Sequence, residues 1–339
     1  MSRFVKGLAL LLACLLLTGA AARADTLASV KARGVVTCGA SAGTQGFGAN
    51  RNDAGQWVGL GADYCRALAA AIFNDPSKVS FVALQPADRA GALAGHNVDA
   101  LADLVPWTLS ADTDSGMRFV ATVFYDGQGF MVTKAAALRS ARDLDGKRIC
   151  AENMAMATKA SRYFDANNIT ATATVMPNRD AAIASYLDGS CAAITAPSSE
   201  LAGIRAGLPQ PADHLLLPDI IDKEPLSIAV ASGDDRWFDL ARWTFFSLLD
   251  AEELGVTQSN VDEMLGSDNI SIRRLLGVEG DFGTEIGLNK DWAYQVIKAV
   301  GNYADLYDRN VGESTPLKLP RGLNALWNKG GIQYSPPVR

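Results

Sequence analysis

Two kinds of hydrophobic pattern alternate along this chain. Short, nearly continuous apolar runs predict buried strands, and segments whose apolar residues recur every three or four positions predict helices. In the first third of the chain we expect strands at residues 35–38, 79–84 and 98–101 and helices at 27–33, 62–73 and 88–94. Strands that alternate with helices in this way form a mostly parallel sheet with helices on both faces.

The same alternation begins again after Val132, with strands expected at 147–150, 173–176, 191–195 and 226–231 and helices at 156–166, 180–187 and 198–206. We therefore expect two α/β lobes. The first comprises residues 25–132 and 226–339, and the second, residues 133–225, is an insertion joined by a hinge of two strands. Because open α/β sheets bind ligands at the carboxyl ends of their strands, a binding site is expected where the chain crosses between lobes, within residues 98–132.

The last third of the chain is mainly helical. An apolar stripe at helical spacing, ended by Gly255, predicts a helix that faces the core, and its members are Trp237, Ala241, Phe245, Leu248 and Leu249. A second long helix is expected at residues 292–307. The proline- and glycine-rich tail, residues 316–339, is expected to wrap the surface.

Composition narrows the possible functions. The chain has 339 residues, 48% of them hydrophobic and 20% charged, which is ordinary for a globular protein and enough for two lobes. A net charge of −6 leaves no basic stripe for phosphates, so we expect no nucleic-acid partner. With only two histidines and no closely spaced cysteines, we expect neither a metal site nor a cofactor.

The amino terminus has the pattern of an export signal. Arg3 and Lys6 precede an apolar run at 7–17, and Ala22-Arg23-Ala24 has the small-x-small form of a cleavage site. We expect residues 1–24 to be removed and the mature protein to lie in the periplasm. A lipoprotein box ending at Cys14 is the less favoured alternative, because cleavage there would leave a very short apolar region.

Four cysteines remain after this signal: Cys38, Cys65, Cys150 and Cys191. In an exported protein an even number of cysteines is expected to form disulfides, and four cysteines permit three connectivities. The pairs Cys38–Cys65 and Cys150–Cys191 would keep each bridge within one lobe. Four buried free thiols are the alternative.

Several segments together resemble a known family. They include VVTCGAS, DYCRALAAAI, WTLSADT, FYDGQGFMV, KEPLSIAVASGDDRWFDLARW and DWAYQVIKAVGNYADLYDRNVG. Over nearly its whole mature length the chain is similar to the periplasmic general L-amino-acid-binding proteins of ABC importers, within solute-binding family 3. The resemblance implies a two-lobed, venus-flytrap (type II) fold with a helical C-terminal extension. It also implies a monomer that closes on a small amino-acid-like solute, an inner-membrane ABC permease as partner, and two cysteine pairs.

The positions that anchor the ligand in this family are substituted here. Where the family has a Thr-x-Thr-x-x-Arg pattern, whose arginine binds the ligand carboxylate, this chain keeps Thr108 but has Pro106 and Ala111 in the first and last places. Pro197 replaces the acidic partner of the ligand ammonium. Asn153-Met154-Ala155-Met156 replaces a hydroxyl-rich turn of the second lobe. The resemblance therefore implies the family scaffold with an altered ligand site.

Seven residues are candidate ligand contacts, drawn from a glycine-rich loop, from the crossing stretch and from the second-lobe turn: Phe47, Trp107, Thr108, Glu152, Asn153, Met154 and Met156. Each also has a purely structural interpretation as a core, capping or surface residue. Arg89 and Arg118 are the nearest cations that could replace the missing arginine. Asp126 is expected to fix the hinge turn, and Asp103 or Asp112 to be solvated.

Three functions fit this sequence. The leading one is a non-enzymatic solute-binding component of an ABC importer. A sensory or interaction protein with a vestigial cleft is the second, and the missing anchors favour it. The third is a dehydratase of a cyclic acid, which the same fold can host. Glu152 is the candidate acid for such an enzyme, but no nucleophile with a base accompanies it, so we expect no catalytic residue.

Overall fold

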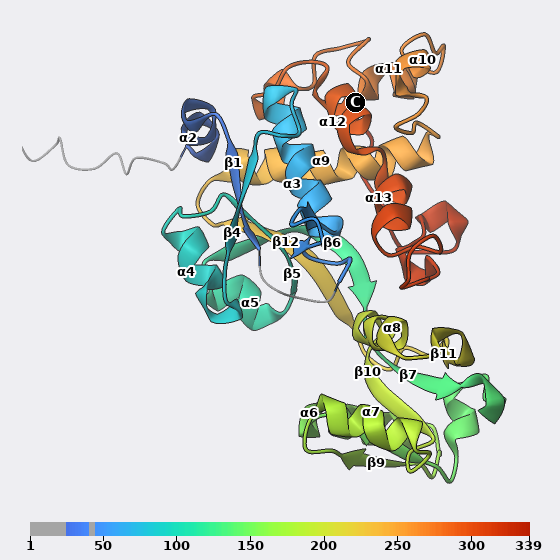
Figure 1. The fold of residues 1–339 in the computed structure, drawn as a ribbon. Coiled ribbons are helices and arrows are strands. Elements are labelled where there is room, and N and C mark those ends of the chain that lie inside the picture. The colour runs from blue at the N-terminus through green and yellow to red at the C-terminus, as the bar shows by residue number, and fades with distance from the viewer. Residues whose placement is uncertain (1–24, 41–44) are drawn as a thin grey trace, which may run out of the picture.

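The computed structural model describes residues 25–40 and 45–339 and contains two five-stranded sheets with helices around each (Figure 1). The expected signal peptide, residues 1–24, lies outside the described residues. Among the described residues, none of the helices combines the length and the hydropathy that a membrane span needs.

The first sheet has the strand order β4-β1-β5-β12-β6. These strands span Val79–Ala83, Val36–Ala40, Ala100–Pro106, Glu224–Ala231 and Met117–Asp126. β1 is parallel to β4 and β5, as the alternation of strands and helices predicts. β12 is antiparallel to both of its neighbours, because it returns from the second sheet and enters from the opposite end.

The second sheet has the order β11-β7-β10-β8-β9. Its strands span His214–Leu216, Gln128–Thr133, Ala193–Pro197, Arg148–Ala151 and Thr172–Val175. β8 is parallel to β9 and β10, whereas β7 is antiparallel to β10 and β11. The remaining strands, β2 and β3, span Asn50–Arg51 and Trp57–Val58 and form a small separate ribbon.

The chain first crosses between the sheets at Gly127. β6 ends at Asp126 and β7 starts at Gln128, so β7 belongs to the second sheet, and the crossing precedes the expected boundary at Val132. A Cβ atom at position 127 would lie 2.4 Å from the carbonyl oxygen of Asp222, on the segment that leads back into β12. Glycine is required here because the two crossing segments approach each other so closely.

Helices pack on both sheets. α3 (Leu60–Phe73), α9 (Asp235–Glu253), α12 (Trp292–Val300) and α13 (Tyr303–Asn310) gather on one side of the first sheet, and α4 (Arg89–Ala94) and α5 (Leu109–Asp114) on the other (Figure 1). α6, α7 and α8 surround the second sheet and span Met154–Ala166, Arg179–Leu187 and Ser198–Gly207. The others, α2, α10 and α11, span Thr26–Arg33, Val261–Met264 and Ile270–Leu275.

The predicted apolar stripe before Gly255 is confirmed as core, because all five of its side chains on α9 are at most 2% exposed. The single helix expected at residues 292–307 is wrong. Gly301, with a φ of 85°, ends α12, and Asn302 begins α13 through reciprocal hydrogen bonds with Asp305. Apolar residues keep their helical spacing across this break, so the pattern alone does not reveal it.

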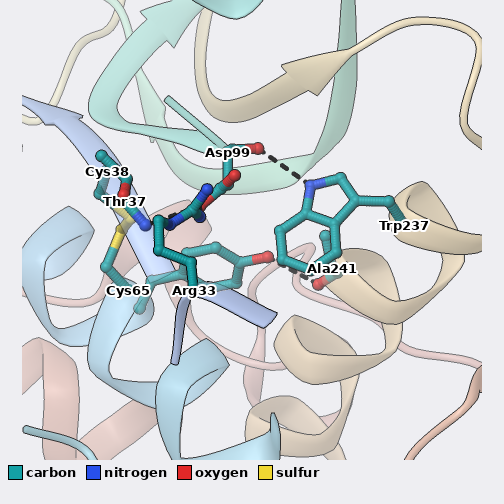
Figure 2. The surroundings of a disulfide bond; sticks show 8 residues. Arg33, Thr37, Cys38, Cys65, Asp99, Trp237 and Ala241 are labelled. Atoms are coloured by element: carbon teal, nitrogen blue, oxygen red, sulfur yellow. Dashed lines mark hydrogen bonds and ion pairs between the residues drawn. A yellow bond between two sulfur atoms is a disulfide. The ribbon is translucent and has the colours of Figure 1, made fainter. Parts of the chain in front are cut away.

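Disulfides join the two within-lobe pairs, Cys38–Cys65 and Cys150–Cys191. Figure 2 shows the first, between β1 and α3, together with Asp99 at the start of β5. The Asp99 carboxylate accepts a 2.7 Å hydrogen bond from the Thr37 N–H and pairs with Arg33. Its carbonyl accepts a 2.9 Å hydrogen bond from the Trp237 indole on α9. This corner of the first lobe is thus held by covalent, ionic and hydrogen bonds.

Residues 316–339, the C-terminal strap, contact β6. The Asn324 side chain accepts from the Tyr125 N–H at 2.7 Å and donates to the Tyr125 carbonyl at 3.2 Å. Gln333 Nε2 donates to the carbonyls of Thr122 and Val123 at 3.2 and 3.3 Å. These bonds occupy the outer edge of β6, so the strap serves in place of a further strand.

Candidate functional site

A cavity of about 180 Å³, the interlobe cavity, lies where the chain crosses between the sheets. Its wall on the side of the first sheet consists of Phe47, Gly48, Arg89, Asp103, Leu104 and Pro106. The rest of its lining comes from the second sheet, from α8 and from the crossing strands: Pro197, Ser199, Glu200, Asp126, Glu224 and Leu226. A solute in this cavity would therefore contact both lobes and the hinge.

Larger hollows lie elsewhere on the protein. One of about 470 Å³ lies beside the start of α9, and another of about 520 Å³ lies near β11. Each is lined from one lobe alone. A solute bound in either of them would not link movement of the lobes to its own binding, so size does not make them better candidates.

Arg89 and Asp103 form the charged part of the first-lobe wall. Arg89 is the first residue of α4, and its Nε and Nη2 atoms each lie 2.8 Å from Asp103 Oδ2. Asp103 is 3% exposed, so the expectation of a solvated carboxylate is wrong for Asp103, whereas Asp112 is exposed. A Cβ atom at Gly48 would lie 3.1 Å from Asp103 Oδ1, and the glycine lets this loop approach the carboxylate.

Two carboxylates face each other at the hinge. Asp126 ends β6, Glu224 begins β12, and the antiparallel register pairs them directly. Asp126 accepts a 3.3 Å hydrogen bond from the Ser199 N–H at the start of α8, so it links the lobes. Burial raises the pKa of Asp126 to about 6 and also raises the pKa of Glu224. Like charges directly opposite each other in a sheet are destabilising.

Arg179, at the start of α7, holds the carboxylates of the second lobe. Its Nε donates to Glu152 at 2.8 Å and its Nη2 to Glu200 at 2.9 Å. Burial raises the pKa of Glu200, although Arg179 opposes this effect. Nearby, Lys159 pairs with Asp222 at 2.5 Å. Each of these two cations is thus already engaged by carboxylates.

Four residues that the sequence indicated as possible contacts or as substituted anchors line the interlobe cavity: Phe47, Arg89, Pro106 and Pro197. Phe47 is 3% exposed and packs edge-on against Phe124, with ring centroids 4.7 Å apart, so it also serves the core. Pro106 and Pro197 end β5 and β10, on opposite sides of the cavity. Two of the substituted anchor positions therefore contribute to the present lining.

The other first-lobe candidates lie outside this lining. Trp107 stacks on Phe119, with ring centroids 5.4 Å apart, and borders a separate hollow beside the C-terminal strap. Thr108 caps α5 by accepting a 3.2 Å hydrogen bond from the Ala111 N–H. Ala111 packs against the apolar cluster beneath α4 and α5. Arg118 pairs with Asp235, away from the cavity.

The second-lobe turn is built around a helix cap. Asn153 accepts a 3.0 Å hydrogen bond from the Met156 N–H and begins α6. Met154 is 68% exposed, and Met156 packs against a core cluster. Glu152 is held by Arg179. None of these four lines the interlobe cavity in this arrangement of the lobes, and they remain predicted contacts for a closed one.

The sequence did not single out Glu200 and Glu224, and it assigned Asp126 to the hinge turn alone. Glu200 lies in the first turn of α8, immediately after the strand that ends at Pro197. Asp126 and Glu224 lie at strand ends next to the crossing. Position at a strand end near the crossing, or in the helix turn directly after one, is the signal that could have identified all three.

Known proteins similar to this chain bind solutes. No protein-family model matches it. It is 46% identical to the general L-amino acid-binding periplasmic protein AapJ of Rhizobium johnstonii, over 96% of this chain and 97% of that protein. It is 44% identical to the glutamate/glutamine/aspartate/asparagine-binding protein BztA of Rhodobacter capsulatus, over 95% and 96% of the two chains.

A solved structure agrees with these relatives. It is the structure of a periplasmic binding protein of an ABC transporter from Brucella ovis, with glutathione bound. The two chains superpose with a TM-score of 0.78 and are 47% identical, over 93% of this chain and all of that one. The two-lobed fold and the similar proteins indicate the same family. This chain belongs to the family of general L-amino-acid-binding periplasmic proteins of ABC transporters.

Proposed function

We propose that this protein is the periplasmic solute-binding component of an ABC importer, and that it closes its lobes on an amino acid or a related small polar solute. The observation that carries this proposal is the interlobe cavity, which is lined from both sheets and from the crossing strands. The family to which the chain belongs supports it. A solute that contacts both lobes stabilises the closed arrangement by the difference between its affinities for the two arrangements.

The hinge in this proposal consists of Gly127 and the segment before β12. The same proposal includes the lobe division expected from the sequence, in which residues 133–225 form the inserted lobe. Its boundary changes in one respect, because β7 also belongs to the inserted lobe. Each lobe has its own disulfide, and the C-terminal strap holds β6 as far as Tyr125. Bending is therefore expected to concentrate at the glycine rather than within a lobe.

The partner in this proposal is an inner-membrane ABC permease, which receives the solute from the closed protein. We propose no enzymatic step. The candidate acid of a dehydratase, Glu152, accepts a 2.8 Å ionic hydrogen bond from Arg179. Its carboxylate is held by this guanidinium and is not part of the lining of the interlobe cavity.

Mass spectrometry of small molecules released from denatured, freshly purified mature protein tests the proposal, together with thermal unfolding in the presence of the solutes found. A solute at 100 times its Kd should stabilise the protein by about 2.7 kcal/mol. Small-angle scattering should show a smaller radius of gyration with solute bound. A protein that releases no solute, and whose unfolding temperature no small polar solute raises, would contradict the proposal.

A further inference from the structure

The interlobe cavity is strongly acidic. Its lining holds four carboxylates, Asp103, Asp126, Glu200 and Glu224, and one cation, Arg89. Arg89 is bound by Asp103 through two 2.8 Å contacts. Glu200 shares Arg179 with Glu152. Negative charge therefore exceeds positive charge at the place where the two lobes would meet a solute.

The direct pairing of Asp126 with Glu224 goes against the ordinary preferences of a sheet. Antiparallel register sets both side chains on the same face, where like charges repel. Burial and this neighbour raise the pKa of Asp126, and burial raises the pKa of Glu224 as well. A positively charged group between them would remove the repulsion, and buried acids arranged in this way are typical of a functional site.

A ligand carboxylate has no comparable partner here. Around the cavity, the described cations that approach it already hold acids: Arg89 holds Asp103, Arg179 holds Glu152 and Glu200, and Lys159 holds Asp222. The family's arginine position carries Ala111, which packs against an apolar cluster. A carboxylate would add negative charge to an acidic cavity or break an existing ion pair.

We propose that the interlobe cavity takes an organic cation, an amine or guanidinium solute without a free carboxylate, and that Asp126, Glu200 and Glu224 bind its charge when the lobes close. This inference rests on the proposed function, because it concerns the solute of the same cavity. It makes the three carboxylates the determinants of specificity. The prolines at positions 106 and 197 supply apolar walls that suit the methylene chain of such a solute.

Calorimetric titration of the mature protein at pH 7.5 tests the inference, with putrescine and agmatine as cationic probes and L-glutamate and L-glutamine as carboxylate-bearing ones. At least one cation should bind about 100-fold more tightly than either amino acid. Asp126→Asn and Glu224→Gln should each weaken that binding about 30-fold or more. Asp250→Asn is the matched control: its pKa is also about 6, but it lies beneath the C-terminal strap, bonded to Ser335, and its removal should leave cation binding unchanged.

The outcomes separate this inference from the proposed function. Tighter binding of L-glutamate or L-glutamine than of both cations would overturn the inference and leave the proposed function in place. A protein that binds none of the four probes but releases a carboxylate-bearing solute on denaturation would have the same meaning, whereas release of another organic cation would support the inference. Equal loss of cation binding in the Asp250→Asn control would also overturn it, because the effect would then not be specific to the cavity.

Discussion

The buried hinge carboxylate predicts a variant that is more stable than the natural protein. Asp126 is 6% exposed, and burial raises its pKa from the ordinary 3.8 to about 6. A pKa difference of one between folded and unfolded states corresponds to about 1.4 kcal/mol, so ionised Asp126 destabilises the folded state by about 3 kcal/mol at neutral pH. Asp126→Asn removes this charge and keeps an oxygen that can accept the hydrogen bond from Ser199.

The sign of the pH dependence follows from the raised pKa. The destabilisation by Asp126 is fully present above pH 6, decreases as pH falls through 6, and disappears below about 3.8. The Asn variant should therefore exceed the natural protein in stability by up to about 3 kcal/mol at pH 7.5, which for ~300 residues corresponds to an unfolding temperature about 5 °C higher. The difference should shrink as pH approaches 4.

Urea unfolding of both proteins at pH 7.5 and pH 4.5, followed by tryptophan fluorescence, measures this difference. Asp53→Asn, at an exposed position, is the control and should change stability little at either pH. A hinge variant that is less stable than the natural protein at pH 7.5, or a difference that does not depend on pH, would refute the reasoning. Asp126 would then be stabilised as an anion in the folded state.

Three further predictions concern the scaffold. Replacement of Cys38 and Cys65 by alanine should lower the free energy of unfolding in urea by about 3.5 kcal/mol, because the bridge closes a loop of 27 residues. An unchanged free energy of unfolding would contradict the chain-entropy account. Asn324→Ala should lower the free energy of unfolding by about 1–3 kcal/mol and speed hydrogen exchange in β6, because two hydrogen bonds to the backbone of β6 disappear. Unchanged exchange in β6 would refute the role of the strap. Gly61→Ala should abolish or severely reduce the yield of soluble folded protein, because the new Cβ would lie 1.6 Å from the Ala102 carbonyl oxygen. A normal yield with a normal circular dichroism spectrum would argue against this packing.

The sequence predicted most strands and long helices, because burial turns strands into short apolar runs and places apolar residues at every third or fourth position of helices. It missed α5, whose residues, LSADTD, have no apolar face, and it missed the break at Gly301, where the periodicity continues through a left-handed residue. Both are local backbone events that hydrophobic periodicity does not record.

The candidate site was predictable in part, from the expected ends of strands and from the resemblance to the family. Pro106 and Pro197 lie at strand ends and border the cavity, but Trp107 follows Pro106 and borders a different hollow. Trp107 lies one residue beyond the end of β5, and successive residues of an extended segment point to opposite faces, so neighbours in sequence need not share a site. The pairing of Asp126 with Glu224 depends on the register of strands almost 100 residues apart, which no local pattern contains.

The central place of β12 in the first sheet also bears on how the protein matures. β12 lies between β5 and β6, so the first lobe cannot complete its sheet until residues 224–231 have emerged. The second sheet is formed by one continuous segment, residues 128–216, whose contacts are closer in sequence. Shorter loop closures favour faster folding. We therefore expect the second lobe to fold first, outside the channel, while the sheet of the first lobe stays incomplete until β12 has also crossed.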